Sequence, residues 1–430
     1  MASPTAPKSI IIIGASISGL TLACSITHHF RAAPAAGAPP RLTIFDSRGS
    51  ATPPTGAIML CPNGLRVLDA LGVYEALCAD AFVGRCVAYL DAGLRTTDRF
   101  WFGGADRWGY PAVRLHRCVL VARLRALAAA LGVRVEYGCR FEGVAQDAGA
   151  GLVVKFEGGR SETADMLIGA DGIHSSVRAS AFPQAEPPRY AGILSVSGSV
   201  KRSKLRMPKD VDVELPGIVS GTGANVAFLM ITHSRDGEDI MIGVNRVHPQ
   251  ELDKKGYAEL RADIGKVKSI FYGREGDSWP DLVQSAIENL QEETVYLWPF
   301  YELPKLDHWI DATGRVLLVG DAAHAMPPPA GQGANQAVED CWALALVLAK
   351  RSTKGDILMS DALKAWETMR LKRIEKVSEL NAILINARLP PEKRKQMNGQ
   401  KDVMTGELPL DWLYAARPED ELLKWLESHC

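Results

Sequence analysis

The sequence predicts an α/β fold in which βα units lie at both ends of the chain, a mainly antiparallel sheet is inserted between them, and helices follow at the C-terminal end. Three apolar runs each meet a glycine or an acidic residue and continue as a helical pattern, in "SIIIIGASISGL", "DMLIGADGIHSSVR" and "GRVLLVGDAAHAMPPPAGQGANQAVED". Between Tyr190 and Asn245, polar and apolar residues alternate instead, as in "ILSVSGSV" and "DIMIGVNRV". Continuous apolar runs that lead into helices are typical of parallel strands, whereas alternation is typical of antiparallel sheets.

The composition is that of an ordinary globular protein, with 430 residues of which 47% are hydrophobic and 23% charged. This length is sufficient for two domains. The formal net charge of −1 does not favour binding to nucleic acid or to an anionic membrane. The eight cysteines include no CxxC pair, which favours reduced thiols over disulfides or a zinc site. We therefore expect a cytoplasmic monomer or homodimer without a metal ion, a nucleic acid or a membrane as partner.

The first motif lies in the longest apolar run, from Ser9 to Ile26, which contains two glycines and is therefore interpreted as strand, turn and helix rather than as a membrane span or signal peptide. In "GASISG", Gly14 suits the tight turn of a dinucleotide-binding fingerprint and Gly19 suits close helix packing, while Ser16 replaces the usual second glycine. Asp46 ends the next predicted strand, "RLTIFDS", where an acid can accept hydrogen bonds from ribose hydroxyls. An ordinary strand–turn–helix and a solvated turn residue remain the alternatives.

Further elements are predicted along the rest of the chain. A helical pattern covers Val119–Leu131, and residues 133–159 are predicted to form a meander of strands. After the alternating segment, helical patterns extend to about Leu290. The segments "TVYLWPFYEL", "DALKAWETMRLKRIEKVSELN" and "PEDELLKWLES" then predict a strand, a long amphipathic helix and a last helix.

The second and third motifs follow the other two apolar runs. Asp171 and Gly172 predict a sharp turn before a helix start. Asp321 comes directly after "RVLLVG", at the strand end where open α/β sheets bind ligands. Prolines 327 to 329 stiffen the next loop, and "GQGANQAVED" begins a helix whose first N–H groups face that loop. His324, between them, is interpreted as a packed histidine rather than a catalytic one.

Together these motifs resemble those of the FAD-dependent aromatic-ring monooxygenases, the single-component group that includes para-hydroxybenzoate and salicylate hydroxylases. The resemblance covers roughly Lys8 to Asn381 and includes "LHRCVL", "TGAIMLCPNGLRVLDALG" and "WETMRLKR". It implies a Rossmann-like FAD-binding domain, an inserted, mainly antiparallel β-sheet substrate domain and a C-terminal helical segment. The implied boundaries are 1–75, 113–185 and 301–350 for the FAD-binding domain, 76–112 and 186–300 for the substrate domain, and 351–430 for the C-terminal helices.

The resemblance implies that FAD binds without a covalent link. The "GASISG" turn would hold its ADP half, with Asp46 on the adenosine ribose. Asp321 would hold the ribityl chain, and the loop from Pro328 through Asn335 would lie beside the isoalloxazine ring. The helix N-terminus after this loop would stabilise the negative charge of reduced flavin. The implied cofactor-binding residues are Gly14, Ser16, Gly19, Asp46, Ala57, Arg117, Asp171, Gly172, Gly320, Asp321, Pro328, Gly331, Gln332, Gly333, Ala334 and Asn335.

Several of these residues carry further implied roles. Ala57 would line the flavin. Arg117 would reach it from a helix start, with Arg114 as a second candidate. Asp171 and Gly172 would contribute to pyrophosphate binding and to the use of NAD(P)H, for which no second dinucleotide fingerprint is present.

The implied activity is insertion of one oxygen atom from O2 into a small aromatic or conjugated substrate, by hydroxylation or epoxidation, through a flavin C4a-hydroperoxide with NAD(P)H as transient reductant. Two alternatives remain, a related FAD-dependent reductase or dehydrogenase without oxygen transfer and an inactive flavin-fold protein. "LWPFYELP" disfavours a halogenase. Catalytic residues stay unknown, because Ser197 stands where several members carry an arginine that could clamp a substrate phenolate. The polar or aromatic candidates, each expected to be a packing residue first, are Tyr110, Tyr190, His233, Trp298 and Tyr301.

Overall fold

A five-stranded parallel sheet joins the segments that carry the three motifs. In the computed structural model, which describes residues 7–49, 55–146, 151–223, 227–274, 278–353, 358–388 and 405–428, the three apolar runs form neighbouring strands. The order in this sheet is β18 (Val316–Leu318), β12 (Met166–Gly169), β1 (Ser9–Ile13), β2 (Arg41–Asp46) and β8 (Arg134–Tyr137). All four pairings are parallel, which confirms the predicted α/β class.

The second large sheet has seven strands and is mainly antiparallel, as the alternating segments predict. Within the described residues its one parallel pairing joins β14 (Gly217–Val219) to β5 (Cys86–Leu90), so the segments 86–101 and 189–302 contribute to one sheet. Three helices and a buried aromatic cluster that includes Phe228 and Phe271 cover one face. The strand order is β17 (Gln291–Glu302), β13 (Arg189–Lys201), β16 (Asp239–Val247), β15 (Phe228–Thr232), β14 (Gly217–Val219), β5 (Cys86–Leu90) and β6 (Thr96–Trp101), and the helices are α7 (Lys254–Ala262), α8 (Ile264–Tyr272) and α9 (Asp281–Glu288).

Two three-stranded sheets complete the β-structure. One contains β3 (Ala57–Leu60), β7 (Ala112–His116) and β4 (Phe82–Gly84). The other contains β9 (Phe141–Gln146), β10 (Leu152–Phe156) and β11 (Ser161–Ala164). The predicted meander over 133–159 is thus only partly correct, because β8 leaves it to pair in parallel with β2. The turn at Gly138, with φ +72°, separates β8 from the meander.

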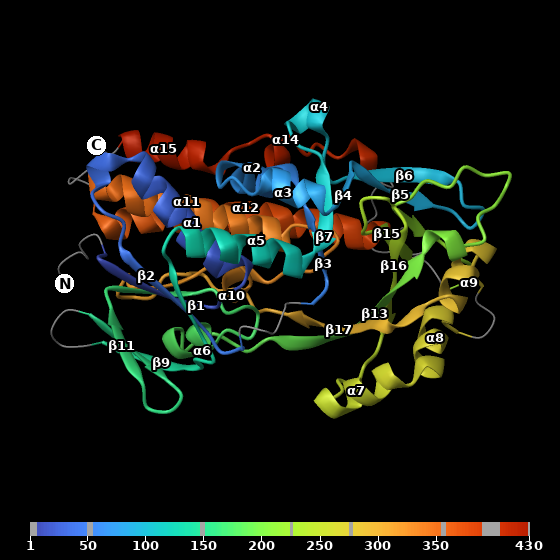
Figure 1. The fold of residues 1–430 in the computed structure, drawn as a ribbon, viewed down its shortest axis with the longest axis horizontal. Helices are drawn as coiled ribbons and strands as arrows, with labels where there is room; N and C mark the ends of the chain where they lie inside the picture. Colours follow the sequence, from blue (N-terminus) through green and yellow to red (C-terminus); the bar gives the residue numbers. More distant parts are fainter. Residues whose placement is uncertain are drawn as a thin grey trace.

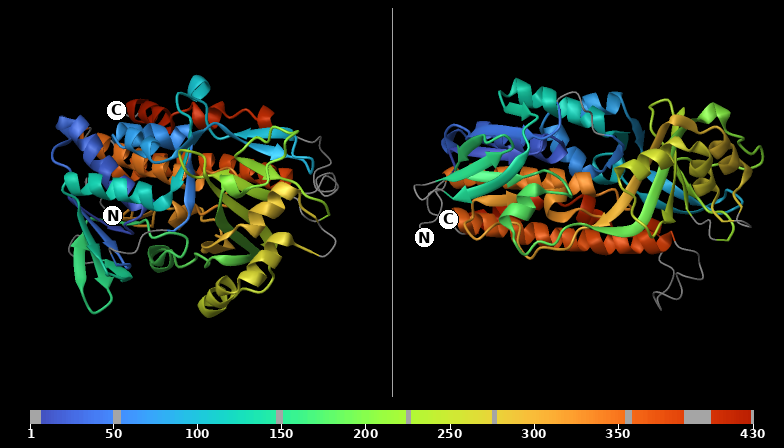
Figure 2. Two further views of the ribbon diagram at one scale, coloured as in Figure 1. Left: turned by 45° about the vertical axis from the view of Figure 1, so that its right-hand side comes forward. Right: turned by 90° about the horizontal axis from the view of Figure 1, so that it is seen from below.

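Helices fill the space between the sheets (Figure 1). The helix α12 is the longest of the described part and runs along both halves of the molecule (Figure 2). No helix within the described ranges is long and apolar enough to cross a membrane, and the seven cysteines found there are free. The remaining elements are α1 (Ile17–Ala32), η1 (Pro34–Ala36), α2 (Pro62–Ala70), α3 (Tyr74–Ala79), α4 (Ala105–Trp108), α5 (Arg117–Ala130), α6 (Ser176–Ala181), η2 (Arg202–Lys204), α10 (Asp321–His324), α11 (Gly333–Thr353), α12 (Met359–Ala387), η3 (Thr405–Glu407), α14 (Asp411–Tyr414) and α15 (Pro418–Ser428).

Candidate functional site

The three motif loops contact one another at the carboxyl edge of the parallel sheet. Gly14 follows β1 with φ +110°, and a Cβ atom there would lie 2.3 Å from the carbonyl oxygen of Ala170, which precedes Asp171. Gly320 follows β18 with φ +61°, and a Cβ atom there would lie 2.4 Å from Ser18 Oγ. Both positions therefore require glycine, for backbone conformation and for space. The fold thus brings together three segments that are about 150 residues apart in the chain, as expected for strands that share one edge.

The first loop has the features that its fingerprint predicts. A Cβ atom on Gly19 would lie 2.0 Å from Gly14 O, so α1 packs closely on the turn. Ser16 is the N-cap residue of α1, and its side chain makes no capping hydrogen bond. The first N–H groups of a helix lack acceptors within the helix. This turn therefore offers backbone donors and a free hydroxyl to a ligand.

Asp46 is buried and holds the first loop through a hydrogen bond to its backbone. Its Oδ2 accepts a 2.8 Å hydrogen bond from the Ala15 N–H and its Oδ1 accepts one from the Arg48 N–H. The Arg48 guanidinium also forms an ion pair with this carboxylate. Burial acts to raise the pKa of Asp46, but the hydrogen bonds from Arg48 and Ala15 outweigh it and hold the pKa below its ordinary value. The carboxylate is thus fixed beside the turn and is not a solvated turn residue.

The second loop uses its acid to start a helix. The carboxylate of Asp171 accepts hydrogen bonds from Ser175 Oγ at 2.5 Å and from the Ser176 N–H at 2.7 Å, at the beginning of α6. Burial raises the pKa of Asp171. Gly172 has φ +83° and open space around its missing Cβ, so it serves the turn by conformation alone. The roles of these two residues toward a ligand stay predictions.

The third loop presents Asp321 on an exposed surface. It is the first residue of α10, and its side chain has no hydrogen-bond partner in the described part of the chain. Gly331 has φ +63°, its N–H donates to Pro328 O at 2.8 Å, and a Cβ atom there would lie 2.9 Å from Phe102 Cε1. The exposed acid thus precedes a tight loop that leads into α11.

The start of α11 is anchored to β3 and to the residue that follows it. Asn335, fully buried, donates from Nδ2 to Met59 O and to Gly331 O, and its Oδ1 accepts from the Cys61 N–H. Buried Gln332 accepts from Asn63 Nδ2 at 3.0 Å. The partly exposed first residues of the helix, Gly333 and Ala334, lie between these two anchors. Asn335 and Gln332 therefore position the loop through contacts with the protein itself.

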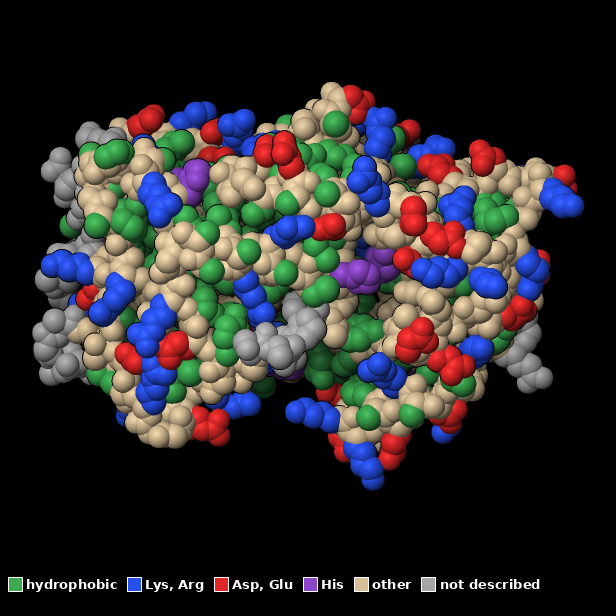
Figure 3. Space-filling view, in the orientation of Figure 1, with side chains coloured by type: hydrophobic (Ala, Val, Ile, Leu, Met, Phe, Trp, Pro, Cys, Tyr) green, Lys and Arg blue, Asp and Glu red, His purple; other side chains and the backbone are tan. Residues whose placement is uncertain are grey.

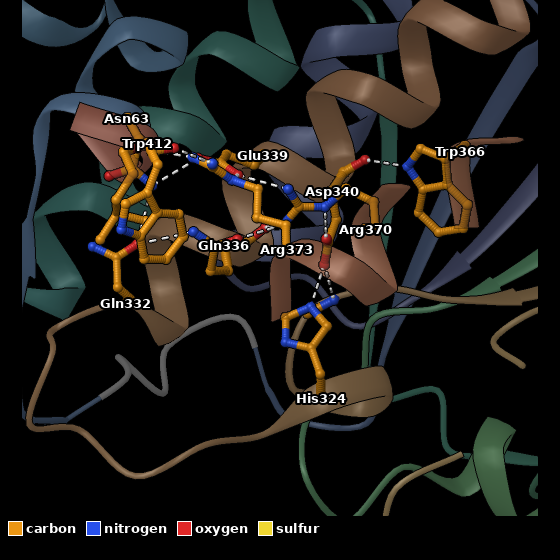
Figure 4. A network of polar contacts seen from close by, with 12 residues as sticks. Asn63, His324, Gln332, Gln336, Glu339, Asp340, Trp366, Arg370, Arg373 and Trp412 are labelled. Carbon is orange, nitrogen blue, oxygen red and sulfur yellow. Dashed lines mark hydrogen bonds and ion pairs between the residues drawn. The ribbon is translucent and has the colours of Figure 1, made fainter. Parts of the chain in front are cut away.

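A buried ionic network lies beneath this loop (Figure 4). Asp340 accepts from the Gly320 N–H, from His324 Nε2 and from Arg370 Nε. Arg370 and Arg373 both form ion pairs with Glu339. Burial acts to raise the pKa values of Glu339 and Asp340, but the cations beside them outweigh it and hold both below their ordinary values. Sequence reasoning did not find these two acids, and His324 is indeed a packed residue.

Two arginines lie at the junction between the small sheet and the seven-stranded sheet. Arg117 begins α5, and its guanidinium lies 5.5 Å from the ring centroid of Trp298. Its Nε is buried without a partner in the described residues. Arg114, on β7, donates from Nε to His233 Nδ1 at 3.2 Å. The two arginines therefore have different surroundings.

The other aromatic candidates make contacts that account for their positions. Tyr110 donates to Asp69, Tyr190 donates to His248 O, and Tyr301 bonds to Glu251. Within the described segments, no group of three or more His, Cys, Asp or Glu side chains could hold a metal ion.

Comparisons with known proteins agree with this geometry. A family described as "FAD binding domain" matches residues 8–244 and 310–380. The chain is 30% identical over 380 residues to a 3-amino-4-hydroxybenzoate 2-monooxygenase of Streptomyces cremeus, covering 86% of this chain and 84% of that protein. It is 27% identical to the FAD-dependent monooxygenase ausM of Aspergillus calidoustus, covering 85% and 77%.

A solved structure has the same fold. Klebsiella pneumoniae HpxO, crystallised with FAD and uric acid, superposes with a TM-score of 0.68 at 23% identity, over 99% of this chain and 97% of that one. The family match covers most of the chain, and both relatives are named as monooxygenases. The chain therefore belongs to the FAD-binding-domain family and is an FAD-dependent aromatic-ring monooxygenase.

Proposed function

We propose that this enzyme uses NAD(P)H and O2 to insert one oxygen atom into a small aromatic or conjugated substrate, by hydroxylation or epoxidation. The observation that carries the proposal is that the three motif loops meet at the carboxyl edge of the parallel sheet, and that Gly331 of the third loop lies against Phe102, which follows β6 of the seven-stranded sheet. On the face that Figure 3 shows, a hollow contains hydrophobic side chains and has histidine side chains at its rim. The name of the Streptomyces relative supports an aromatic substrate.

The residues at the sheet edge fit FAD by their chemistry. Gly14 and Gly19 allow the tight turn and the close packing of α1 that a dinucleotide-binding loop needs, because a Cβ atom at either position would collide with the backbone. Asp321 is exposed and without a partner among the described residues, as an acceptor for ribityl hydroxyls should be. The Nε atom of Arg117 is buried and has no hydrogen-bond acceptor among the described residues. A buried donor without a partner costs about 1–3 kcal/mol, which a bound cofactor would relieve.

When bound, FAD would supply the redox chemistry, which is the transfer of electrons from NAD(P)H to O2 and of one oxygen atom to the substrate. This chain's residues hold and shield the reacting centre. The N-terminus of α11, with Gly333 and Ala334 in its first turn, favours negative charge on the side of the loop. Prolines 327 to 329 fix the loop, and the seven-stranded sheet would cover the substrate and limit the access of water.

The test begins with the purified protein. The flavin should be yellow in the native protein and should remain in the supernatant after acid precipitation, because no covalent link is proposed. A screen of aromatic compounds should then find some that stimulate NADH or NADPH oxidation, and labelled O2 should place one labelled atom in the product. Substrate-stimulated NAD(P)H oxidation without label in any product would instead indicate a reductase or dehydrogenase.

A further inference from the structure

Arg114 carries a positive charge that no carboxylate of the described residues balances. Its Nε donates to His233 Nδ1 at 3.2 Å and its Nη2 lies 3.4 Å from Met241 Sδ. Within the described residues Arg114 forms no ion pair, and its side-chain contacts use only Nε and Nη2, so Nη1 has no partner there. Burial lowers the pKa of Arg114 to about 10, so the guanidinium remains charged at neutral pH. A desolvated cation without a counter-charge is unfavourable unless an anion binds to it.

His233 adds a second donor to the same place. It is buried, and burial together with the charge of Arg114 lowers its pKa to about 2, so the ring is neutral. Because Nδ1 accepts from Arg114, the hydrogen-bond pattern assigns the proton to Nε2. No described residue accepts a hydrogen bond from Nε2. Nε2 and Arg114 Nη1 are thus two open donors on neighbouring side chains.

This pair lies beside the loop that is proposed to contact the flavin. Arg114 on β7 pairs with Met59 on β3, and directly paired residues of antiparallel strands share one face of the sheet. On that face, the Cβ position of Gly331 lies 3.4 Å from Met59 Cβ. Met59, Met241 and Phe102 make this neighbourhood apolar, which suits a planar ring.

We infer that Arg114 and His233 form the recognition site for an anionic oxygen substituent, a carboxylate or a phenolate, on an aromatic substrate. The inference rests on the proposed function and narrows its substrate class. The guanidinium supplies charge and the imidazole supplies a directed hydrogen bond, so a substrate anion is held while its ring lies in the apolar surroundings. Ser197, whose Oγ bonds to Tyr296 O, has no charge with which to do this.

The experiment uses the oxidised holoenzyme near neutral pH and follows the flavin absorbance as ligands bind. The probes are para-hydroxybenzoate, salicylate and 3-amino-4-hydroxybenzoate, each compared with its carboxamide and with its methyl ether. The carboxamide removes the carboxylate charge and the methyl ether removes the phenolate, so the two arms distinguish the two sources of negative charge. We expect at least one acid or phenol to bind about tenfold or more tightly than its neutral partner, a difference of about 1.4 kcal/mol.

Three variants assign this preference to residues. Arg114→Gln removes the charge and should abolish the preference, and His233→Leu removes the second donor and should lower it by about threefold. Arg123→Gln, at an exposed arginine of α5 that pairs with Asp80, should keep it. Circular dichroism and a melting curve report whether each variant folds.

A panel in which no anionic probe binds more tightly than its neutral partner, including a panel in which nothing binds, overturns the inference. So does full preference in Arg114→Gln or His233→Leu. A wild-type enzyme that hydroxylates only neutral aromatics would contradict the recognition site but leave the proposed function intact. Absence of labelled oxygen from every product would contradict the proposed function itself.

Discussion

His324 Nε2 lies 2.5 Å from Asp340 Oδ2, and the same oxygen accepts the N–H of Gly320 at 2.9 Å. Asp340 is on α11, whereas Gly320 and His324 flank the segment that begins with Asp321. Arg370 of α12 bonds to the other oxygen of the same carboxylate at 2.7 Å. One buried acid thus fixes the backbone that carries the predicted ribityl ligand and joins it to two long helices.

Asp340→Asn should destabilise the protein strongly. The substitution keeps the size of the side chain but leaves Arg370 and His324 facing a neutral amide inside the protein. Removing one member of a buried ion pair costs about 3–5 kcal/mol, and we expect a loss in the free energy of unfolding of that order, together with lower flavin content. Denaturant unfolding measures the loss. Asp361→Asn, at an exposed acid in the first turn of α12, is the matched control and should change stability by less than about 0.5 kcal/mol.

Gly331→Ala should weaken FAD binding more than Gly109→Ala does, because it adds a steric clash to the cost of the left-handed backbone. Gly331 and Gly109 have similar positive φ values, +63° and +82°, but only Gly331 has a neighbour in the way, with Phe102 Cε1 2.9 Å from its Cβ position. Phe102 is buried against Phe100, so its ring has no room to change rotamer and relieve the clash. Both variants should lose about 1–2 kcal/mol of stability through the left-handed backbone. Equal FAD affinity in the two variants would show that the Phe102 contact does not shape the loop.

Much of the fold was predictable because the three motif strands carry local signals. Apolar runs that lead into the turns at Gly14, Gly172 and Gly320 indicate parallel strands and tight turns before any contact is known. The exchange of β8 from the meander to the parallel sheet was not predictable, since strand pairing depends on neighbours distant in sequence. The division into domains and the ligand roles of the motif residues remain predictions.

The sequence could not indicate residues whose role depends on ion-pair or hydrogen-bond partners that are distant along the chain. Glu339 and Asp340 look like ordinary helix acids until the fold places Arg370 and Arg373 against them. Arg114 and His233 were each among the candidates from the sequence, but they are 119 residues apart and nothing in either local sequence indicates their contact. Conversely, the hydrogen bonds of Asn335 to β3 and to its own loop show that a residue in a recognised motif can serve the loop itself.

The free energy of unfolding should decrease as the pH is lowered below about 6.5, because His233 remains neutral in the folded protein but takes up a proton in the unfolded chain. Its pKa is lowered to about 2 by burial and by the charge of Arg114, whereas in the unfolded chain it takes up a proton below about 6.5. The unfolded state therefore binds more protons in this range, and one such histidine removes about 2 kcal/mol at pH 5. Unfolding titrations of His233→Asn should show a shallower pH dependence than the wild type. His248→Asn, just after β16, should keep the wild-type slope, and identical slopes in all three proteins would contradict the assignment.

Arg117→Ala should weaken FAD retention or slow flavin reduction, because a cation predicted to lie near the flavin is lost. The guanidinium lies over Trp298 and has a buried Nε without a described acceptor. Flavin content after gel filtration and stopped-flow reduction by NAD(P)H measure the two effects. Arg123→Ala in the same helix is the control. If Arg117→Ala matches that control in both assays, the residue is only structural, and Arg114 becomes the arginine to test for flavin contact.

Asp321→Ala should raise the dissociation constant of FAD by about one to two orders of magnitude. As an exposed acceptor at the carboxyl edge of β18, its carboxylate would receive a charge-assisted hydrogen bond from a ribityl hydroxyl, worth about 1.5–3 kcal/mol. Since about 1.4 kcal/mol corresponds to a factor of ten, the affinity loss should be easy to resolve. Stability without flavin should barely change, because the side chain makes no hydrogen bond within the described protein. Asp307→Ala, at another exposed acid before the same strand, serves as control. Asp321 could bind the ribityl chain or could only cap α10, and titration of apo-protein with FAD together with melting curves without flavin separates these two roles. If the affinity for FAD stays within about threefold of the parent while the free energy of unfolding falls by about 1 kcal/mol, Asp321 only caps α10.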